Sequence, residues 1–204
     1  MNKNTIYNQI KKNFHKLDPS YEYYSILIPI IEINDILYLL FEIRSNNLRR
    51  QPGEISFPGG KKESGESFKE TAIRETTEEL NISRKKIEII GSLSPISTHY
   101  NDLIYPFVGF LHNITIKNIN FNRSEVNNLF IIPISFFIEN PPLKYYIETQ
   151  PNPSKDFPYY LLPTGKNYKF LKGNYPVYFY KYKNYVIWGL TARIVKNFMD
   201  ILEN

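Results

Sequence analysis

The chain has 204 residues, of which 42% are hydrophobic, and its formal net charge is +5. This length and composition predict one compact domain over residues 1–204, without a linker or repeat to divide it. The absence of cysteine excludes disulfides, thiol nucleophiles and cysteine-based zinc sites. A basic chain can attract nucleic acid, membrane phosphate or a small anionic substrate, but its lysines and arginines are scattered, so we expect no nucleic-acid partner.

The first segment predicts a short amphipathic helix over about residues 4–16, with Ile6, Ile10 and Phe14 on one stripe. It lacks the apolar core of a signal peptide, and no apolar run in the chain approaches the roughly twenty residues that cross a bilayer. We therefore expect a soluble, cytoplasmic protein that does not associate with a membrane. The sequence leaves the oligomeric state open.

Four strand-like runs follow, separated by polar or Asn-Asp turns, at residues 24–33, 36–43, 86–95 and 103–111. Two helices are well marked, from about Ser67 to Asn81 and from Leu190 to Leu202. This order of elements predicts an α/β/α sandwich. Residues 141–173, rich in Pro, Lys and Tyr, predict a long excursion with short strands that either shapes a substrate pocket or only decorates the surface.

The most informative segment is residues 57–82, which read FPGGKKESGESFKETAIRETTEELNI. Isolated glutamates at such spacings usually belong to a solvated helix face. Here, however, Glu75, Glu78 and Glu79 fall within an arc of roughly 100° on one helix, so their carboxylates converge. Glu79 also projects within the apolar arc expected to face the core, which is formed by Phe68, Ala72, Ile73, Thr76 and Leu80.

Carboxylates crowded beside apolar surface repel one another and are poorly solvated, so some must protonate or share a cation. A divalent cation is the simplest solution, and a set of oxygen ligands without histidine or cysteine favours Mg²⁺ or Mn²⁺ over zinc. The pair Gly59 and Gly60 either forms a plain turn or brings the backbone close to a ligand, where a Cβ would obstruct it.

The same segment closely matches the box G-x5-E-x7-R-E-U-x-E-E-x-G-U, in which U is apolar, and the chain resembles the Nudix hydrolases. Thr76 occupies an apolar slot, and Asn81 replaces the last glycine, where it suits a left-handed helix end. The resemblance implies that the Gly60 carbonyl is a further metal ligand. It also implies a general base, either Glu75 or a downstream loop acid, for which Asp102 and Glu125 are the candidates.

Upstream, residues 40–60 read LFEIRSNNLRRQPGEISFPGG and resemble the second motif of the coenzyme A pyrophosphatase branch, LLTxRSx3Rx3Gx3FPGG. Phe41 and Glu42 stand where that motif has Leu and Thr. Residues 105–109 and 187–192 also look like segments of this branch. Its substrate carries several phosphates, so the substrate-binding candidates are Arg44, Arg49 and Phe57, although both arginines could instead form ordinary ion pairs.

We expect Arg74 to orient the acids by pairing with Glu66, which, like Gly59, has a structural role in the box. The reaction predicted from the resemblance is metal-assisted attack of water on the diphosphate of coenzyme A or its derivatives, giving 3′,5′-ADP and 4′-phosphopantetheine or its acyl form. His99 could contact the substrate or face solvent.

Three alternatives stay open. One is a Nudix hydrolase for another nucleoside diphosphate derivative, such as ADP-ribose, a dinucleotide or capped RNA. Another is a non-catalytic, nucleotide-sensing module, and the third is an interaction protein with an accidental acidic helix.

Overall fold

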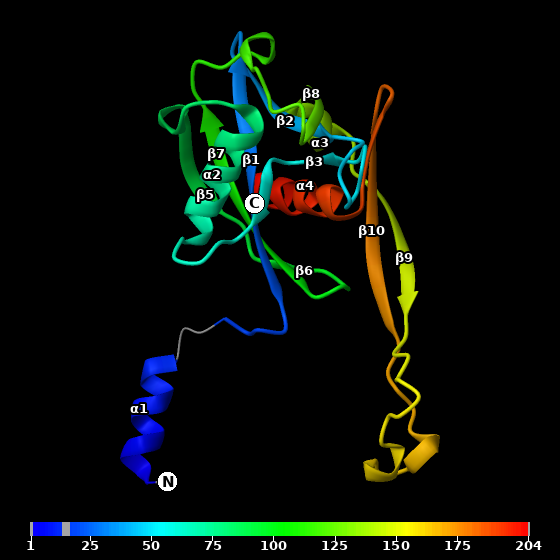
Figure 1. Ribbon diagram of the computed structural model, residues 1–204. Coiled ribbons are helices and arrows are strands. Elements are labelled where there is room, and N and C mark those ends of the chain that lie inside the picture. The colour runs from blue at the N-terminus through cyan, green and yellow to red at the C-terminus, as the bar shows by residue number, and fades with distance from the viewer. Residues whose placement is uncertain (1, 14–16, 204) are drawn as a thin grey trace.

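A computed structural model describes residues 2–13 and 17–203 (Figure 1). Its helices are α1 (Lys3–Asn13), α2 (Phe68–Leu80), α3 (Ile134–Glu139) and α4 (Gly189–Leu202). Its strands are β1 (Glu22–Ile33), β2 (Ile36–Arg44), β3 (Ile55–Ser56), β4 (Gly59–Lys61), β5 (Ile87–Ser92), β6 (Ile96–Ser97), β7 (Asp102–Leu111), β8 (Val126–Pro133), β9 (Leu143–Thr149), β10 (Gly173–Tyr182) and β11 (Tyr185–Trp188). No helix among the described residues is long and apolar enough to span a bilayer.

The main sheet is mixed and is built around β1. This strand pairs in parallel with β7 and antiparallel with β2 and β4, and the strand order is β3-β2-β1-β7-β5. β1 can occupy the centre because it carries apolar side chains on both faces. Leu27 and Ile31 point to one side of the sheet, and Ile28 and Ile30 point to the other.

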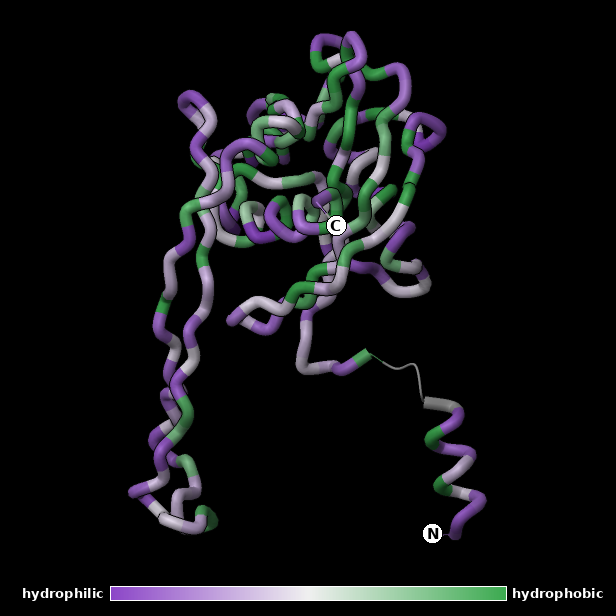
Figure 2. The backbone as a smooth tube through the Cα atoms, turned by 180° about the vertical axis from the view of Figure 1, so that it is seen from behind, coloured by the Kyte–Doolittle hydropathy of each residue, from purple (hydrophilic) through white to green (hydrophobic). Residues whose placement is uncertain are grey.

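One layer of helix covers each face of this sheet. Leu80 at the end of α2 packs with Leu27 and Leu40 in one core, and Phe198 of α4 packs with Ile28 in the other. Figure 2 shows that hydrophobic residues are concentrated along the strands of the sheet. The α/β/α sandwich expected from the order of elements is therefore confirmed, and its sheet is mixed.

A split between β1 and β2 places the glycine pair in the middle of the sheet. The two strands pair only near their hairpin, from Ile30–Leu39 to Ile33–Ile36. Beyond that point β3 pairs with the end of β2 and β4 pairs with the start of β1. The N–H of Leu27 donates to the carbonyl of Pro58 at 2.9 Å, which anchors the connection between these two short strands.

Local side chains define both ends of α2. Ser67 and Glu70 form a reciprocal capping box, in which each side chain accepts from the backbone N–H of the other. Asn81 ends the helix with φ 50° and ψ 48°, the left-handed conformation expected for it. Phe68 was expected in the core but is only half-buried and stacks on Tyr105, with ring centroids 3.6 Å apart.

The second sheet, in the order β11-β10-β9, includes a hairpin arm that extends from the body (Figure 1). Two strands of this arm are longer than the short strands expected for residues 141–173, and residues 150–172 between them contain only two short 3-10 turns, Tyr159–Leu161 and Gly165–Asn167. α3, β10 and β11 were not predicted, and the run at 86–95 yields only β5 before a break. Phe14 lies outside the described residues, so the third position of the predicted N-terminal stripe cannot be placed.

Candidate active site

Arg74 is the centre of an ion-pair network on α2. Its Nε donates to Oε2 of Glu66 at 3.2 Å and its Nη2 to Oε1 at 3.0 Å, so the expected pair with Glu66 is present. Its Nη1 also donates to Glu75 at 2.8 Å and to Glu78 at 3.1 Å. The carbonyl of Lys61 accepts a further bond from Nη2 at 3.2 Å, which ties the network to β4. One guanidinium thereby gathers three of the four box carboxylates.

Glu66 is the most firmly held of these acids. It accepts hydrogen bonds from the N–H of Glu63 at 2.7 Å and from the hydroxyl of Thr71 at 2.8 Å, in addition to those from Arg74. The hydrogen bonds from Arg74 are the main reason why the pKa of Glu66 falls to about 2. Glu66 therefore stays charged and fixes the direction of the guanidinium.

Glu79 points into the protein, against the glycine pair. Its side chain is buried, and its Oε2 accepts from the N–H of Gly59 at 2.8 Å. Burial, and next the charge of Glu42, raise the pKa of Glu79 well above its ordinary value. Burial also raises the pKa of Glu75.

Both glycines are required by close approach rather than by a plain turn. A Cβ on Gly59 would lie 2.5 Å from the carbonyl oxygen of Ser25, and one on Gly60 would lie 2.5 Å from Oε2 of Glu75. The backbone of Gly60 consequently contacts the carboxylate of Glu75 with no side chain between them.

Glu42 on β2 completes the acidic cluster and was not predicted as a site residue. It is completely buried, its Oε1 accepts from the hydroxyl of Ser56 at 2.9 Å, and its Oε2 has no hydrogen-bond partner. Burial raises the pKa of Glu42 to about 7. The signal in the sequence was its departure from the upstream motif, which has Thr at this position.

A cleft of about 600 Å³ lies beside the glycine pair. Gly59, Gly60 and Arg44 form part of its wall, and Arg50 lines it as well. Arg50 donates from Nη1 to the hydroxyl of Tyr24 at 2.9 Å. Among the described residues, no box glutamate lines the cleft. Glu75 and Glu79 lie against the glycine pair instead.

Arg49 and Phe57, the other two predicted substrate-binding residues, are less well placed to contact a ligand in the cleft than Arg44. Arg49 is exposed and does not line the cleft, whereas its neighbour Arg50 does. Phe57 borders the cleft but is buried and stacks on Phe41, with ring centroids 4.8 Å apart. Most of the Phe57 ring is thus part of the core.

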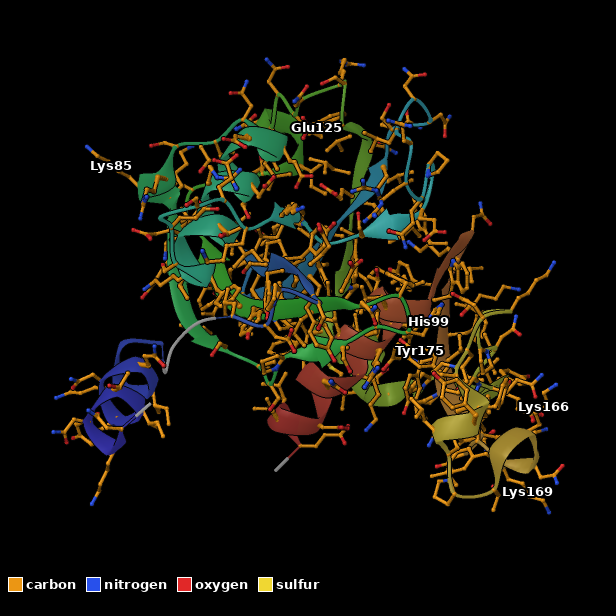
Figure 3. All side chains as sticks on the ribbon, turned by 60° about the horizontal axis from the view of Figure 1, so that its bottom comes forward. Lys85, His99, Glu125, Lys166, Lys169 and Tyr175 are labelled. Atoms are coloured by element: carbon orange, nitrogen blue, oxygen red, sulfur yellow. The ribbon has the colours of Figure 1, made fainter. Side chains whose placement is uncertain are left out.

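Aromatic side chains form the far wall of the cleft. His99 is exposed, lines the cleft and meets the ring of Tyr175 edge-on, with centroids 5.2 Å apart (Figure 3). Tyr100 also packs edge-on against His99, with ring centroids 4.7 Å apart. Tyr175 comes from the arm strand β10, so no sequence signal near the box could have indicated it.

The two alternative general bases lie in different places. Glu125 is half-buried, and its charge contributes to raising the pKa of Glu75. Asp102 is buried at the start of β7, lines the cleft and lies 3.9 Å from Nη1 of Arg50. Glu125 therefore belongs with the box acids, whereas Asp102 belongs with the arginine at the cleft.

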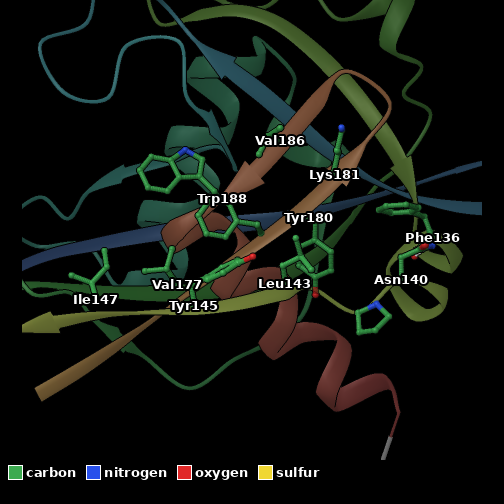
Figure 4. Close-up of a pocket in the computed structure, with 12 residues that line it drawn as sticks. Phe136, Asn140, Leu143, Tyr145, Ile147, Val177, Tyr180, Lys181, Val186 and Trp188 are labelled. Carbon is green, nitrogen blue, oxygen red and sulfur yellow. Dashed lines mark hydrogen bonds between the residues drawn. The ribbon is translucent and has the colours of Figure 1, made fainter.

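A second cavity of about 510 Å³ lies on the three-stranded sheet (Figure 4). Most of the side chains that line it are apolar, among them Leu143, Tyr145, Ile147, Val177, Phe179 and Trp188. Ile147, Val177 and Trp188 also line the cleft beside the glycine pair. The apolar cavity and the cleft are therefore neighbours along one wall.

The donors of the acidic cluster fit a divalent cation that prefers oxygen ligands. Among the described residues no three acidic or histidine side chains stand in a metal-holding group. Arg74 engages Glu66, Glu75 and Glu78. The buried Oε2 of Glu42 lacks a partner, however, and the missing Cβ of Gly60 lets the carboxylate of Glu75 lie against the backbone. A donor set made only of oxygen atoms, without histidine or cysteine, is of the kind that Mg²⁺ or Mn²⁺ prefers.

Comparison with known proteins identifies related chains. The model of the NUDIX domain family matches residues 28–131, about half of the chain. The chain is 32% identical over 164 residues to the mouse protein "Peroxisomal coenzyme A diphosphatase NUDT7", covering 76% of this chain and 67% of that protein. It is 32% identical over 181 residues to "Uncharacterized Nudix hydrolase NudL" of Photorhabdus laumondii, covering 88% of this chain and 84% of that one.

Among solved structures, a MutT/nudix family protein from Enterococcus faecalis superposes with a TM-score of 0.54 at 12% identity. That match covers 100% of this chain and 71% of the other. At this identity the likeness concerns the fold alone, and it agrees with the sandwich described above.

Proposed function

Since the chain belongs to the Nudix hydrolase family and is a diphosphatase, we propose that its substrate is coenzyme A or an acylated derivative. Water would attack one phosphorus of the diphosphate, and the P–O bond to the bridging oxygen would break. The products are 3′,5′-ADP and 4′-phosphopantetheine or its acyl form, with the oxygen of water on one new phosphate.

The observation that carries this proposal is the contact between the cleft and the apolar cavity through Ile147, Val177 and Trp188. Coenzyme A joins a nucleotide to a long, less polar arm through its diphosphate, so it requires both environments on one continuous surface. The similarity to a protein named as a coenzyme A diphosphatase supports the same substrate class.

We assign the cation to Glu75, Glu78, Glu79 and the carbonyl of Gly60. Bound there, Mg²⁺ or Mn²⁺ would neutralise diphosphate oxygens and lower the pKa of a coordinated water molecule. Glu75 is our choice of general base, because burial raises its pKa and a raised pKa makes a carboxylate a stronger proton acceptor. Glu125 is the alternative.

The remaining side chains position the substrate. Arg44 and Arg50 border the cleft, where their guanidinium groups suit phosphate oxygens. Arg49 is exposed on the same loop as Arg50, and its contact with the substrate stays a prediction. The rings of His99 and Tyr175 offer a surface on which an adenine base can stack. Arg74 acts as a positioning residue, since Glu66 holds it and it holds Glu75 and Glu78.

The test is a substrate panel of coenzyme A, acetyl-coenzyme A, ADP-ribose, a dinucleotide and capped RNA, with Mg²⁺ and with product detection by mass spectrometry. We expect kcat/KM to be highest for the two coenzyme A substrates. Glu78→Gln and Glu79→Gln are the matched blanks. Faster cleavage of ADP-ribose, a dinucleotide or capped RNA would overturn the substrate assignment, and binding without turnover would indicate a sensing module.

A further inference from the structure

Glu42 is the buried charge that the proposed function leaves unexplained. Its side chain is completely buried, and a carboxylate in such a place is normally paired or coordinates a metal ion. Ser56 satisfies only Oε1, and Oε2 is without a partner. The Nε of Arg44, two residues along the same strand, is also buried without a hydrogen bond. An acceptor and a donor are thus both unsatisfied in the interior of the site.

Strand geometry directs Glu42 toward α2. Successive side chains along a strand point to opposite faces of the sheet. Leu40 belongs to the core beneath α2 and Phe41 belongs to the core beneath α4. Glu42 therefore faces α2, the helix that carries Glu75 and Glu79.

The backbone brings Glu42 and Glu79 to the same point. Glu42 is paired across the sheet with Ser56, and the N–H of Gly59, three residues after Ser56, donates to Glu79. Of the charges that raise the pKa of Glu79, that of Glu42 has the largest effect, ahead of Glu75. Two buried carboxylates therefore share one small region, where they repel each other unless one is protonated or a cation lies between them.

We propose that Glu42 is a further ligand of the divalent cation, which it binds through Oε2 from the β2 side while Glu79 binds from α2. The hydrogen bond from Ser56 to Oε1 orients the carboxylate for this role. The inference rests on the proposed function, which assigns the cation to the box acids. It goes beyond the family resemblance, because the upstream motif has Thr at this position and a threonine supplies no anionic ligand.

The direct test is a Mn²⁺ titration followed by the EPR signal of the free ion, at one fixed pH, on the full chain. Glu42→Gln should bind Mn²⁺ about tenfold more weakly or worse, the scale of loss when a metal site is deprived of a supporting group. Ser56→Ala, which removes only the orienting hydroxyl, should weaken binding less. Glu32→Gln removes an exposed carboxylate from β1 and should match the wild type.

Thermal unfolding separates a metal ligand from a residue that only packs. Without metal, Glu42→Gln should melt no lower than the wild type, because the amide is isosteric and removes a buried like charge. With saturating Mn²⁺, the rise in Tm should be clearly smaller for Glu42→Gln than for the wild type, since binding to the folded state raises stability. An equal rise in Tm and an equal Mn²⁺ affinity would overturn the proposal.

The failure of this inference is distinguishable from that of the proposed function. If Glu79→Gln loses Mn²⁺ while Glu42→Gln keeps wild-type affinity, Glu42 is not a ligand and the metal-dependent function stands. If the wild type binds no Mn²⁺, both fail. Should Glu42→Gln not fold, anomalous diffraction from wild-type crystals with Mn²⁺ decides: a direct bond from Oε2, at roughly 2.0–2.3 Å, supports the proposal, and a longer separation refutes it.

Discussion

Single atoms decide how the acidic cluster is arranged, and Gly60 is the clearest case. A Cβ at this position would overlap the carboxyl group of Glu75, which is the end of a flexible side chain. The chain can relieve that overlap by moving Glu75 and leaving the fold intact. The penalty therefore falls on the geometry of the site and not on folding.

We predict that Gly60→Ala lowers kcat/KM about a hundredfold, because misplacement of a catalytic group by about 1 Å costs that much. Its free energy of unfolding in urea should stay close to that of the wild type. Gly91→Ala is the matched control, since a Cβ there meets nothing within 4 Å. Equal activity of Gly60→Ala and the wild type would show that the contact between Gly60 and Glu75 is unimportant for catalysis.

Glu66 provides a test of the ion-pair network through pH. Its pKa is about 2 in the folded protein, against an ordinary value of 4.5, chiefly because of Arg74. A lowered pKa means that the pair stabilises the fold fully above about pH 4.5 and loses its effect as pH falls toward 2.

In metal-free buffer at pH 7, Glu66→Gln should therefore be less stable than the wild type by about 1–2 kcal/mol, after allowance for solvent screening of a partly exposed pair. Urea denaturation between pH 3 and pH 7 should show this difference shrinking toward the acid end. A difference independent of pH would mean that packing, and not charge, is what Glu66 contributes.

At the scale of the element, α2 is a helix whose ends are set by local chemistry. Ser67 and Glu70 cap its start, and Asn81 closes it in a left-handed conformation with φ 50°. Asparagine tolerates this conformation better than other side chains do, but glycine adopts it without steric conflict. The family box has glycine at this position.

Asn81→Gly should accordingly leave the fold at least as stable as the wild type, with a gain of up to about 1 kcal/mol, and Asn81→Ala should lose a similar amount. Chemical denaturation of both variants measures this. Activity should be unchanged in Asn81→Gly, because the residue lies at the end of α2, beyond the box acids, and its N–H donates to the carbonyl of Thr77. Greater stability of Asn81→Ala than of Asn81→Gly would contradict the assigned cap.

On the scale of the whole molecule, the arm carries residues of the apolar cavity and also contributes residues to the neighbouring cleft beside the glycine pair. Ile147 on β9 lines both the cleft and the apolar cavity. It is 54% exposed, so a polar substitution there disturbs little of the core. Under the proposed function it contacts the arm of the substrate at a distance from the reacting phosphorus.

Ile147→Ser should raise the KM for coenzyme A several-fold with little change in kcat, because it removes binding that is equal in the ground state and the transition state. Leu161→Ser, also exposed but in a 3-10 turn near the end of the arm, is the control and should behave as the wild type. Steady-state kinetics decide, and a fall in kcat alone would place Ile147 in another role.

The parts of the site that were predicted correctly from the sequence are local ones. The pair between Arg74 and Glu66 and the left-handed cap at Asn81 both lie within one short segment around α2. The convergence of Glu75, Glu78 and Glu79 on one cation stays a prediction, because Arg74 engages Glu75 and Glu78 while Glu79 accepts from Gly59. The sandwich follows from the order of strands and helices, because each apolar face must be covered. These features require no knowledge of distant contacts.

Only the tertiary structure decided which distant residues meet that helix. Glu42 lies near enough to Glu79 for its charge to raise the pKa of Glu79, because β1 and β2 separate and the glycine pair fills the opening between them. Arg50 lies on the loop after β2, and Tyr175 lies on the arm strand β10. The fold brings these two segments, which are far apart in the sequence, to one cleft. Such meetings depend on long-range register, and neither spacing nor composition encodes them within a single segment.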